Sequence, residues 1–435
     1  MTSLPASALS EGTVTLCAVF ILLVPLAGAG VALINTGLGR SRSAAHSMMA
    51  SVCVLAVAAL AYFVCGFAWQ GFAGGPAHAF SAGGRSWNWI AASPFFLRRL
   101  GLAGIPVPLI AGLQIFTVGL AALIPLGAGA DRWRLGAICA STALFAGFTY
   151  PLFAHWVWGG GWLALLGLNC GLGHGFVDAG GSSTIHAVGG LTALAIAWIL
   201  GPRRAKYSAT GLPAAIPGHH GVFVLCGCLL ALVGWLGLNC AGGILFAGVA
   251  LPATALIIIN TVLSGAAAGL TAALVTRTRF GKPDASLTAN GYIGGLVASS
   301  AACAFVQPAE AVIIGIVAGA LVPLSVEWFE FALRVDDPGG AVSVHAVGGI
   351  WGVLALGLFA RFPDPAPGQF IAQLVGVATL LGFVLPLTYG LNWLLDRISP
   401  QRVALEGERQ GMDLHELGAE AYPEFVVHTE EYLPR

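Results

Sequence analysis

Long apolar runs alternate with short polar connections along almost the whole chain. An α-helix needs about 20 mostly apolar residues to cross the hydrocarbon core of a bilayer, and each run approximates that length. The runs are Val14 to Ile34, Met48 to Trp69, Ile105 to Leu126, Leu135 to Trp158, Thr184 to Leu200, Val222 to Leu238, Val249 to Val275, Leu287 to Val306, Ala311 to Phe331, Val342 to Phe359 and Phe370 to Leu395. We therefore predict an all-α integral membrane protein with eleven transmembrane helices.

The first run is expected to remain in the mature protein. No Lys or Arg precedes Arg40, whereas a secretory signal peptide begins with a basic segment. The run from Val14 to Ile34 is also longer than the apolar segment of a typical signal peptide. We interpret it as the first transmembrane helix.

Composition supports a membrane protein and narrows its chemistry. Hydrophobic residues make up 57% of the chain and charged residues only 9%, whereas a soluble domain has roughly 25% charged residues. The formal net charge is zero, which gives no reason to expect a nucleic-acid partner. The nine cysteines include no CxxC pair, so we predict neither a disulfide framework nor a metal site, and no bridge between Cys170 and Cys240.

The distribution of basic residues predicts the orientation. Lys and Arg favour short cytoplasmic loops. With the N-terminus outside, fifteen of the 19 basic residues fall in cytoplasmic segments, and Arg85, Arg98, Arg99 and Arg361 fall outside. We predict an outer N-terminus, a membrane domain over residues 1–398 and a cytoplasmic tail over 399–435.

A short repeat divides the membrane domain. The string HAVGG begins at His186 and again at His345, five predicted helices later. An odd number of crossings makes the two copies run in opposite directions, which indicates a 5+5 inverted repeat over about 13–201 and 220–360. Helix 370–395 is then left over as the eleventh. Such repeats place a transported species near the bilayer midplane, although a short Gly-rich string can also recur by chance.

The two histidines of this repeat lie inside apolar runs, where an ionisable side chain is costly and is usually functional. A simpler explanation is a hydrogen bond between helices. A facing pair, His186 and His345, could instead share one proton and pass another along a narrow apolar tube.

Asp178 is the only acidic residue between Asp131 and Asp284. It could cap the helix that carries His186, or it could hold the mouth of a cation path, and the two roles are compatible. Nearby, Trp156, Trp158 and Trp162 could form an interfacial belt. One of them could instead offer its ring face to a cation.

The chain shows no nucleophile beside a base, no P-loop and no cluster of metal ligands in its sequence. We therefore predict that it is not an enzyme and has no cofactor. A haem held axially by His186 and His345 is a remote alternative that would make the protein an electron carrier.

Several of these segments, taken together and in order, resemble the ammonium transporter (Amt/Mep/Rh) family. The segments are Ala154-His155-Trp156-Val157-Trp158-Gly159-Gly160-Gly161-Trp162, Asp178-Ala179-Gly180-Gly181, His186, Trp235-Leu236-Gly237-Leu238-Asn239, Arg334-Val335-Asp336-Asp337-Pro338 and His345, with Gly411-Met412-Asp413 in the tail. Asp178 precedes His186 by eight residues, and Asp337 precedes His345 by the same distance. The match is most similar to bacterial Amt members.

The resemblance implies a homotrimer in the plasma (inner) membrane, with one pore per subunit for ammonium and ammonia. Trp158, Asp178, Trp235 and Gly242 are then the substrate-binding positions, and the two histidines line the pore. A P-II nitrogen-signalling protein would be a partner at the cytoplasmic face.

The chain also departs from the family pattern at the outer site and gate. Counting seventeen residues back from Asp131 reaches Gln114, which sets the alignment with the family pattern. In that alignment Thr117 stands where the family has one gating phenylalanine. Leu238 stands at the position of the second gating phenylalanine of the family, and Gly242 replaces a serine of the outer site. Phe116 would supply a ring if the register were shifted by one. These departures leave a second hypothesis open, that of an ammonium sensor or regulator with poor conduction.

Overall fold

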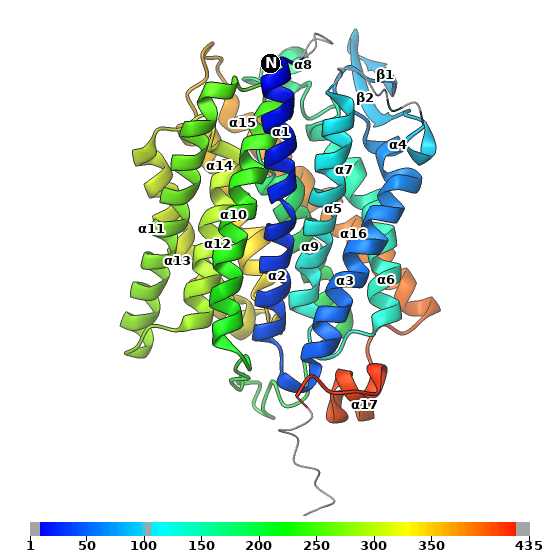
Figure 1. Cartoon of the computed structure of the whole chain (residues 1–435), viewed down its shortest axis with the longest axis vertical. Helices are drawn as coiled ribbons and strands as arrows, with labels where there is room; N and C mark the ends of the chain where they lie inside the picture. Colours follow the sequence, from blue (N-terminus) through cyan, green and yellow to red (C-terminus); the bar gives the residue numbers. More distant parts are fainter. Residues whose placement is uncertain (1–8, 99, 101–105, 423–435) are drawn as a thin grey trace, which may run out of the picture.

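The structure, a computed structural model, describes residues 9–98, 100 and 106–422. Arg99 lies outside these ranges, and so do residues 423–435 of the predicted tail, which include Arg435. The described part is a bundle of long helices. The start of α1 lies at one end, and the short helix α17 of the tail lies at the other (Figure 1). We call the end that carries α17 (Leu405–Gln410) the tail end.

Nine α-helices, which form six segments with their π-helical turns, build the first half of the bundle. They are α1 (Glu11–Leu23) with α2 (Pro25–Leu38), α3 (Ala44–Ala61) with η2 (Tyr62–Gly66) and α4 (Phe67–Gln70), α5 (Val107–Gly129), α6 (Leu135–Leu144) with η4 (Phe145–Thr149) and α7 (Tyr150–Val157), α8 (Leu166–Cys170), and η5 (Ser182–Ala187) with α9 (Val188–Leu200). Turns η1 (Ser41–Ser43) and η3 (Phe95–Leu97) lie in connections.

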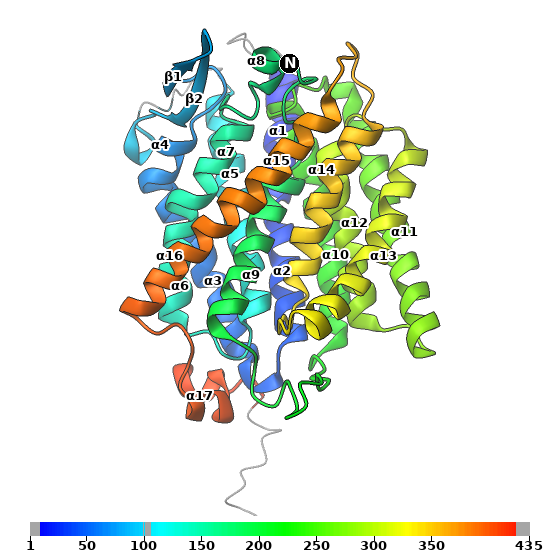
Figure 2. The ribbon, with the colours of Figure 1, turned by 180° about the vertical axis from the view of Figure 1, so that it is seen from behind.

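The second half contains the remaining long helices. They are α10 (Gly221–Leu245), α11 (Thr254–Phe280) after the turn η6 (Leu251–Ala253), α12 (Ala285–Ala302), α13 (Pro308–Ala332), η7 (Val342–Val347) with α14 (Gly348–Phe359), and α15 (Gln369–Thr379) with η8 (Leu380–Val384) and α16 (Leu385–Ile398). The last of these crosses the back of the bundle obliquely, over α9 (Figure 2). The tail follows with α17 and the turn η9 (Asp413–Leu417).

Ten of these segments are long and apolar enough to cross a membrane. They match ten of the eleven predicted runs. The one remaining run, Leu287 to Val306, forms α12, which packs against α10, α11, α13 and α14. Asn290 and several small polar residues make this helix less apolar than the others. Multi-pass membrane insertion is therefore established, whereas the count of eleven stays a prediction.

Glycines allow the closest helix contacts. A Cβ on Gly234 of α10 would lie 2.0 Å from the backbone nitrogen of Ala27 in α2. A Cβ on Gly315 of α13 would lie 2.2 Å from the carbonyl oxygen of Ser264 in α11. These distances leave no room for a side chain, so backbone contact between small residues replaces the hydrophobic effect as the reason for association in lipid.

One connection adds a structure that the sequence pattern did not predict. Strands β1 (Ala77–Ala82) and β2 (Arg85–Ala91) form an antiparallel hairpin at the end opposite the tail (Figure 1). Gly83 and Gly84 at its turn both have positive φ angles, 62° and 72°, as a tight two-residue hairpin turn requires. The membrane-crossing part itself is all-helical, as predicted. All nine cysteines lie among the described residues and are free thiols, Cys170 exposed and Cys240 buried.

Candidate functional site

The two repeated histidines meet in the centre of the bundle. The Nδ1 atoms of His186 and His345 are 3.3 Å apart, and the ring centroids are 5.3 Å apart with planes at 27°. Each ring lies in a π-helical turn, η5 or η7. Turns of this kind occur often at functional sites because the extra residue re-aims a side chain.

The glycine that ends each HAVGG string makes this contact possible. A Cβ on Gly190 would lie 2.2 Å from the backbone nitrogen of Ala346. A Cβ on Gly349 would lie 2.2 Å from the carbonyl oxygen of Ser182. Each string therefore supplies the gap into which the backbone of the other π-helical turn fits, Ala346 of η7 against Gly190 and Ser182 of η5 against Gly349. The imidazoles are brought together as a result.

Trp235 forms one wall beside the pair. Its ring stacks on His186 at a centroid distance of 4.9 Å with planes at 7°. The indole nitrogen donates a hydrogen bond to the Ser300 hydroxyl at 3.2 Å, which fixes the ring. In this structure Trp235 thus contacts one histidine of the pair directly.

Asp178 organises the start of the helix that carries His186. Its carboxylate accepts five hydrogen bonds of 2.6 to 3.1 Å, from the Gly181 amide and from the amide and hydroxyl groups of Ser183 and Thr184. A carboxylate at the first turn of a helix also interacts favourably with the positive end of the helix dipole. The main-chain oxygen of Asp178 accepts a hydrogen bond from the indole of Trp158 at 2.7 Å. Asp178 therefore both caps this helix and positions Trp158.

Asp337 holds the corresponding place before His345 but is less well satisfied. Its Oδ2 accepts a hydrogen bond from the Val342 amide at 2.7 Å. Its Oδ1 is buried and has no hydrogen-bond partner among the described residues. Burial raises the pKa of this carboxyl to about 6.

Trp158 is covered by an aromatic residue that sequence reasoning missed. The ring of Phe246 stacks on it at 4.2 Å between centroids and 10° between planes. Phe246 follows Gly242 by four residues and so lies on the same helical face, a spacing that could have drawn attention to it. Trp156 and Trp158 are 1% and 7% exposed, so the interpretation of these two as an interfacial belt is wrong.

The structure explains why position 242 is a glycine. A Cβ there would lie 2.5 Å from the carbonyl oxygen of Ala179, so a serine could not fit without moving the loop that follows Asp178. Leu238, one turn earlier on α10, is buried. The departure at Gly242 therefore accompanies closer backbone packing between α10 and this loop.

A buried polar cluster lies on α5 at the positions that were predicted to form a gate. The Thr117 hydroxyl donates to Oε1 of Gln114 at 2.9 Å, and the Tyr150 hydroxyl donates to the same atom at 2.8 Å. All three side chains are buried, whereas Phe116 is half-buried. Thr117 rather than Phe116 shares a face with Gln114, and Tyr150 is a member that the sequence did not reveal.

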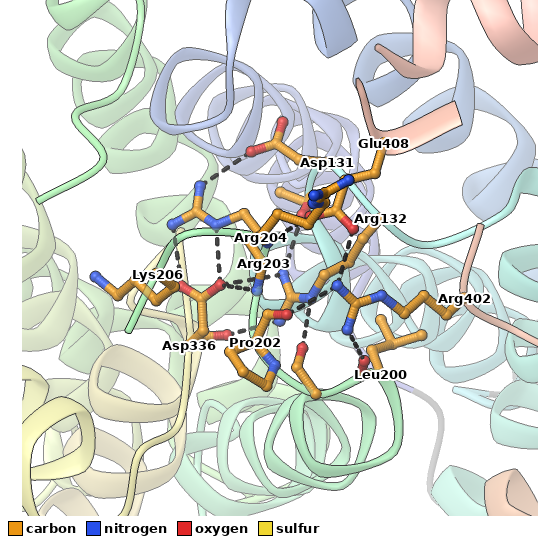
Figure 3. Close-up of polar contacts among 12 residues, drawn as sticks. Asp131, Arg132, Leu200, Pro202, Arg203, Arg204, Lys206, Asp336, Arg402 and Glu408 are labelled. Carbon is orange, nitrogen blue, oxygen red and sulfur yellow. Dashed lines mark hydrogen bonds and ion pairs between the residues drawn. The ribbon is translucent and has the colours of Figure 1, made fainter. Parts of the chain in front are cut away.

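At the tail end, buried charges join three connections of the bundle (Figure 3). Arg203 donates to both carboxylate oxygens of Asp336, at 2.9 and 3.0 Å, and to Asp131 at 2.9 Å. Arg132 donates to three main-chain oxygens, including that of Asp336. Burial alone would raise the pKa of the Asp336 carboxyl, but the guanidinium groups of Arg132 and Arg203 outweigh it and hold that pKa below its ordinary value.

The tail binds to this charge cluster. Arg402 donates to the main-chain oxygens of Leu200 and Pro202 and to the Glu408 carboxylate. The other oxygen of that carboxylate accepts a hydrogen bond from the Arg204 amide at 2.7 Å. From the sequence, Arg204 and Arg402 counted only among the basic residues that predict orientation, because the contacts described here join residues up to 204 positions apart.

Ten apolar spans around a buried, facing histidine pair define a multi-pass membrane transport protein. The chain belongs to the ammonium transporter family, since the model described as Ammonium Transporter Family matches residues 14–422. The ammonium transporter Amt2 of Archaeoglobus fulgidus is 35% identical over 435 aligned residues, which cover 95% of this chain and 88% of that protein.

Solved structures show the same fold. A structure described as a sensor Amt protein superposes with a TM-score of 0.83 at 27% identity, covering 92% of this chain and 97% of that one. The structure of Saccharomyces cerevisiae Mep2 superposes with a TM-score of 0.76 at 26% identity, covering 90% of each chain.

Proposed function

We propose that this chain recruits ammonium at Trp158, removes a proton from it and conducts ammonia past His186 and His345. The observation that carries the proposal is the buried contact of the two imidazoles, because a pair of neutral rings offers both donors and acceptors inside an otherwise apolar path. Membership of the ammonium transporter family supports the choice of substrate.

Energies favour deprotonation before entry. Moving an unpaired cation into a medium of low dielectric constant costs tens of kcal/mol by Born estimates. Removing a proton at pH 7 from an amine with a pKa of about 10.4 costs roughly 4 to 5 kcal/mol. Neutral ammonia therefore crosses a dry segment far more easily than ammonium. Whether the proton follows through the histidines is decided by whether ammonium addition evokes a current.

The proposed topology is an outer N-terminus, eleven spans and a 5+5 inverted repeat over about 13–201 and 220–360, within the membrane domain 1–398. Its support is the position of α1 and the tail at opposite ends (Figure 1), together with the matched Asp178–His186 and Asp337–His345 pairs on η5 and η7. The tail end is then cytoplasmic and Trp158 faces the outside.

We propose a homotrimer and a P-II protein as partners on the basis of family membership. The tail end offers the docking surface, because its loops and tail are already held in one arrangement by Arg402 and Glu408. Chemical cross-linking in native membranes tests the homotrimer. A pull-down of a P-II protein by the purified chain tests the P-II partner.

Substitution of the site residues tests the proposed function directly. In sealed vesicles, we expect His186→Ala to change the current evoked by ammonium relative to the pH change, because the relay loses one imidazole. Trp158→Ala should raise the KM for methylammonium by about three- to thirtyfold, since a cation–π contact contributes about 0.5 to 2 kcal/mol. Trp198→Ala is the matched control, because that side chain is 46% exposed on α9. Equal behaviour of all variants would refute the assignment.

Phe246 provides a second test at the outer site. An aromatic pair contributes about 0.5 to 1.5 kcal/mol, which is close to the cation–π energy, so Phe246 and the cation compete for the face of Trp158. We therefore expect Phe246→Ala to lower the KM for methylammonium by about two- to tenfold. Phe246→Leu keeps much of the apolar volume without the ring and should fall between. A KM unaffected by both changes would show that Phe246 does not cover the recruiting face.

The alternative function is an ammonium sensor with poor conduction. Two observations favour it: Phe246 covers Trp158, and the fold matches a protein described as a sensor Amt protein. Methylammonium uptake by cells without other uptake routes separates the two functions. Robust uptake supports the transporter, whereas binding without uptake supports the sensor.

A further inference from the structure

Two aspartates hold equivalent positions in the two halves of the bundle. His186 and His345 are 159 positions apart, and the same offset relates Asp178 to Asp337. Each aspartate precedes the π-helical turn, η5 or η7, that carries its histidine. The glycine three residues after each aspartate has a positive φ angle, 97° in the first half and 66° in the second. A similar turn therefore places one carboxylate at the start of each of these two helices.

The two carboxylates do not find the same partners. The Asp178 carboxylate accepts five hydrogen bonds, two of them from the hydroxyl groups of Ser183 and Thr184. Val342 stands at the position equivalent to Ser183 and has no hydroxyl group. Its amide donates to Oδ2 of Asp337 at 2.7 Å, whereas Oδ1 has no hydrogen-bond partner within the described ranges. The second carboxylate is therefore less well satisfied than the first.

The charged groups around Asp337 do not supply the missing donor. Asp336, the preceding residue, and Arg132, which follows α5, are the charges that act on its carboxyl. The guanidinium of Arg132 donates its hydrogen bonds to three main-chain oxygens, and Arg203 pairs with Asp336 instead. Asp337 is thus left without a direct ion-pair partner in the part of the chain that the structure describes.

The long helices next to this connection do not compensate its charge either. α5 contacts it through a backbone hydrogen bond of 3.0 Å from the Gly339 amide to the Gly127 carbonyl. α12 contributes the amide of Asn290, which packs against the connection and does not titrate. On α13, Glu327 and Glu330 are each paired with a basic residue. The carboxyl of Asp337 and the imidazole of His345, on η7 itself, are therefore the groups whose titration acts on this turn.

The carboxyl can exchange protons with the solution at the tail end. Asp337 is half-buried and lies in the connection between α13 and η7, next to Asp336 of the charge cluster (Figure 3). A buried charged oxygen without a donor is costly, and protonation removes that charge. The raised pKa of this carboxyl, about 6, has the same cause.

We propose that Asp337 is a proton-dependent cap: uptake of a proton from the tail-side solution removes a buried negative charge and holds η7, with His345, more firmly in place. The turn η5 lacks this response, because five hydrogen bonds stabilise the ionised form of Asp178. The cap responds to pH whether or not the chain conducts ammonia. In the proposed topology it responds to the pH of the cytoplasm.

The sign of the response follows from proton linkage. The pKa of this carboxyl is higher in the folded protein than its ordinary value, so the closed turn binds the proton more tightly than the opened turn does. Protonated Asp337 therefore stabilises the closed turn at low pH, and this contribution is lost as the pH rises through about 6.

Hydrogen exchange of the purified full-length chain, followed by mass spectrometry, tests the cap. After correction for the intrinsic pH dependence of exchange, protection of the peptide that contains η7 should rise by about tenfold between about pH 7.5 and about pH 5. That factor is expected for a carboxyl whose pKa falls from about 6 to its ordinary value when the turn opens. The peptide that contains η5 is the internal control and should change by less than about twofold.

Two substitutions distinguish the cap from other titrating groups. Asp337→Asn keeps an oxygen for the Val342 amide but cannot ionise, so the response of η7 should disappear. Val342→Ser supplies the hydroxyl that Ser183 supplies in the first half, so it should stabilise the ionised form and reduce the response. Asp284→Asn is the matched control, because Asp284 caps α12 by accepting a hydrogen bond from the Leu287 amide at 2.8 Å. It should keep the full response.

The outcomes decide the proposal in both directions. Protection of η7 that does not change with pH in the wild type refutes the cap. A response that persists in Asp337→Asn also refutes it, since His345 on the same turn would then be the source. Should Asp337→Asn not fold, Val342→Ser carries the test, because a response unchanged by the added hydroxyl contradicts a role for the carboxyl.

Discussion

Replacing Asp178 with alanine should abolish ammonium transport and leave a poorly stable protein. The change removes the acceptor of five hydrogen bonds from Gly181, Ser183 and Thr184. Each buried donor left without an acceptor costs about 1 to 3 kcal/mol, so we expect a total loss of several kcal/mol. The loop that positions Trp158 through the Asp178 carbonyl would also loosen, so we expect a more than hundredfold fall in methylammonium uptake at equal protein level.

The conservative variant separates stability from charge. Asp178→Asn keeps one acceptor oxygen, and we expect it to fold with about half of the loss in stability. Uptake is compared at matched amounts of folded protein, and the thermal unfolding midpoint is measured in detergent. If Asp178→Ala transports like the wild type, neither the cap nor the mouth-forming role of this carboxylate is correct.

Replacing Arg203 with methionine should produce the largest loss of stability at the tail end. Asp131 and Asp336 would both lose a direct ion-pair partner while they remain buried. Breaking a buried pair in this way costs about 3 to 5 kcal/mol. The expected result is a fall in the thermal unfolding midpoint of the purified protein and a lower yield from membranes.

A surface pair provides the control. Arg279 pairs with Glu327, but its side chain is 48% exposed, and a surface ion pair of this kind contributes little to stability. Arg279→Met should therefore change the midpoint little. If both variants unfold at the same temperature, the buried cluster does not stabilise the fold.

The pH dependence of this difference has a definite sign. In the wild type, the pKa of Asp336 is held below its ordinary value, so its contribution to stability is present above that value and is lost as the pH falls through the folded pKa. Without Arg203 the carboxyl is buried next to fewer cations, and its pKa rises. The stability gap between wild type and Arg203→Met should therefore narrow on acidification.

The sequence was sufficient for features whose signal is local or repeated. Apolar runs predicted ten spans that the structure contains, because membrane insertion depends on the length and composition of each segment alone. The HAVGG string pointed to His186 and His345, which meet in the structure. The repeat is visible in the sequence because the final glycine of each copy makes the same kind of close backbone contact.

Features that depend on distant contacts were not predicted. Phe246 reaches Trp158 across 88 positions of the chain, and Tyr150 joins Gln114 across 36. Asn290 lies in a polar stretch of α12 that gives no signal in the sequence, and only the fold brings it to the same cavity as His345. The hairpin of β1 and β2 was also missed, because runs of about 20 apolar residues predict spans and give no signal for strands of six and seven residues.

The mutual fit of the two HAVGG strings has an evolutionary consequence. Gly190 contacts the backbone at Ala346, and Gly349 contacts the backbone at Ser182, so a larger residue in either copy would force both helices apart. Neither glycine can therefore be substituted by a larger residue while the other half of the molecule stays unchanged. Any descendant of this chain that keeps its paired imidazoles must inherit both glycines together or lose the pairing in one mutational step.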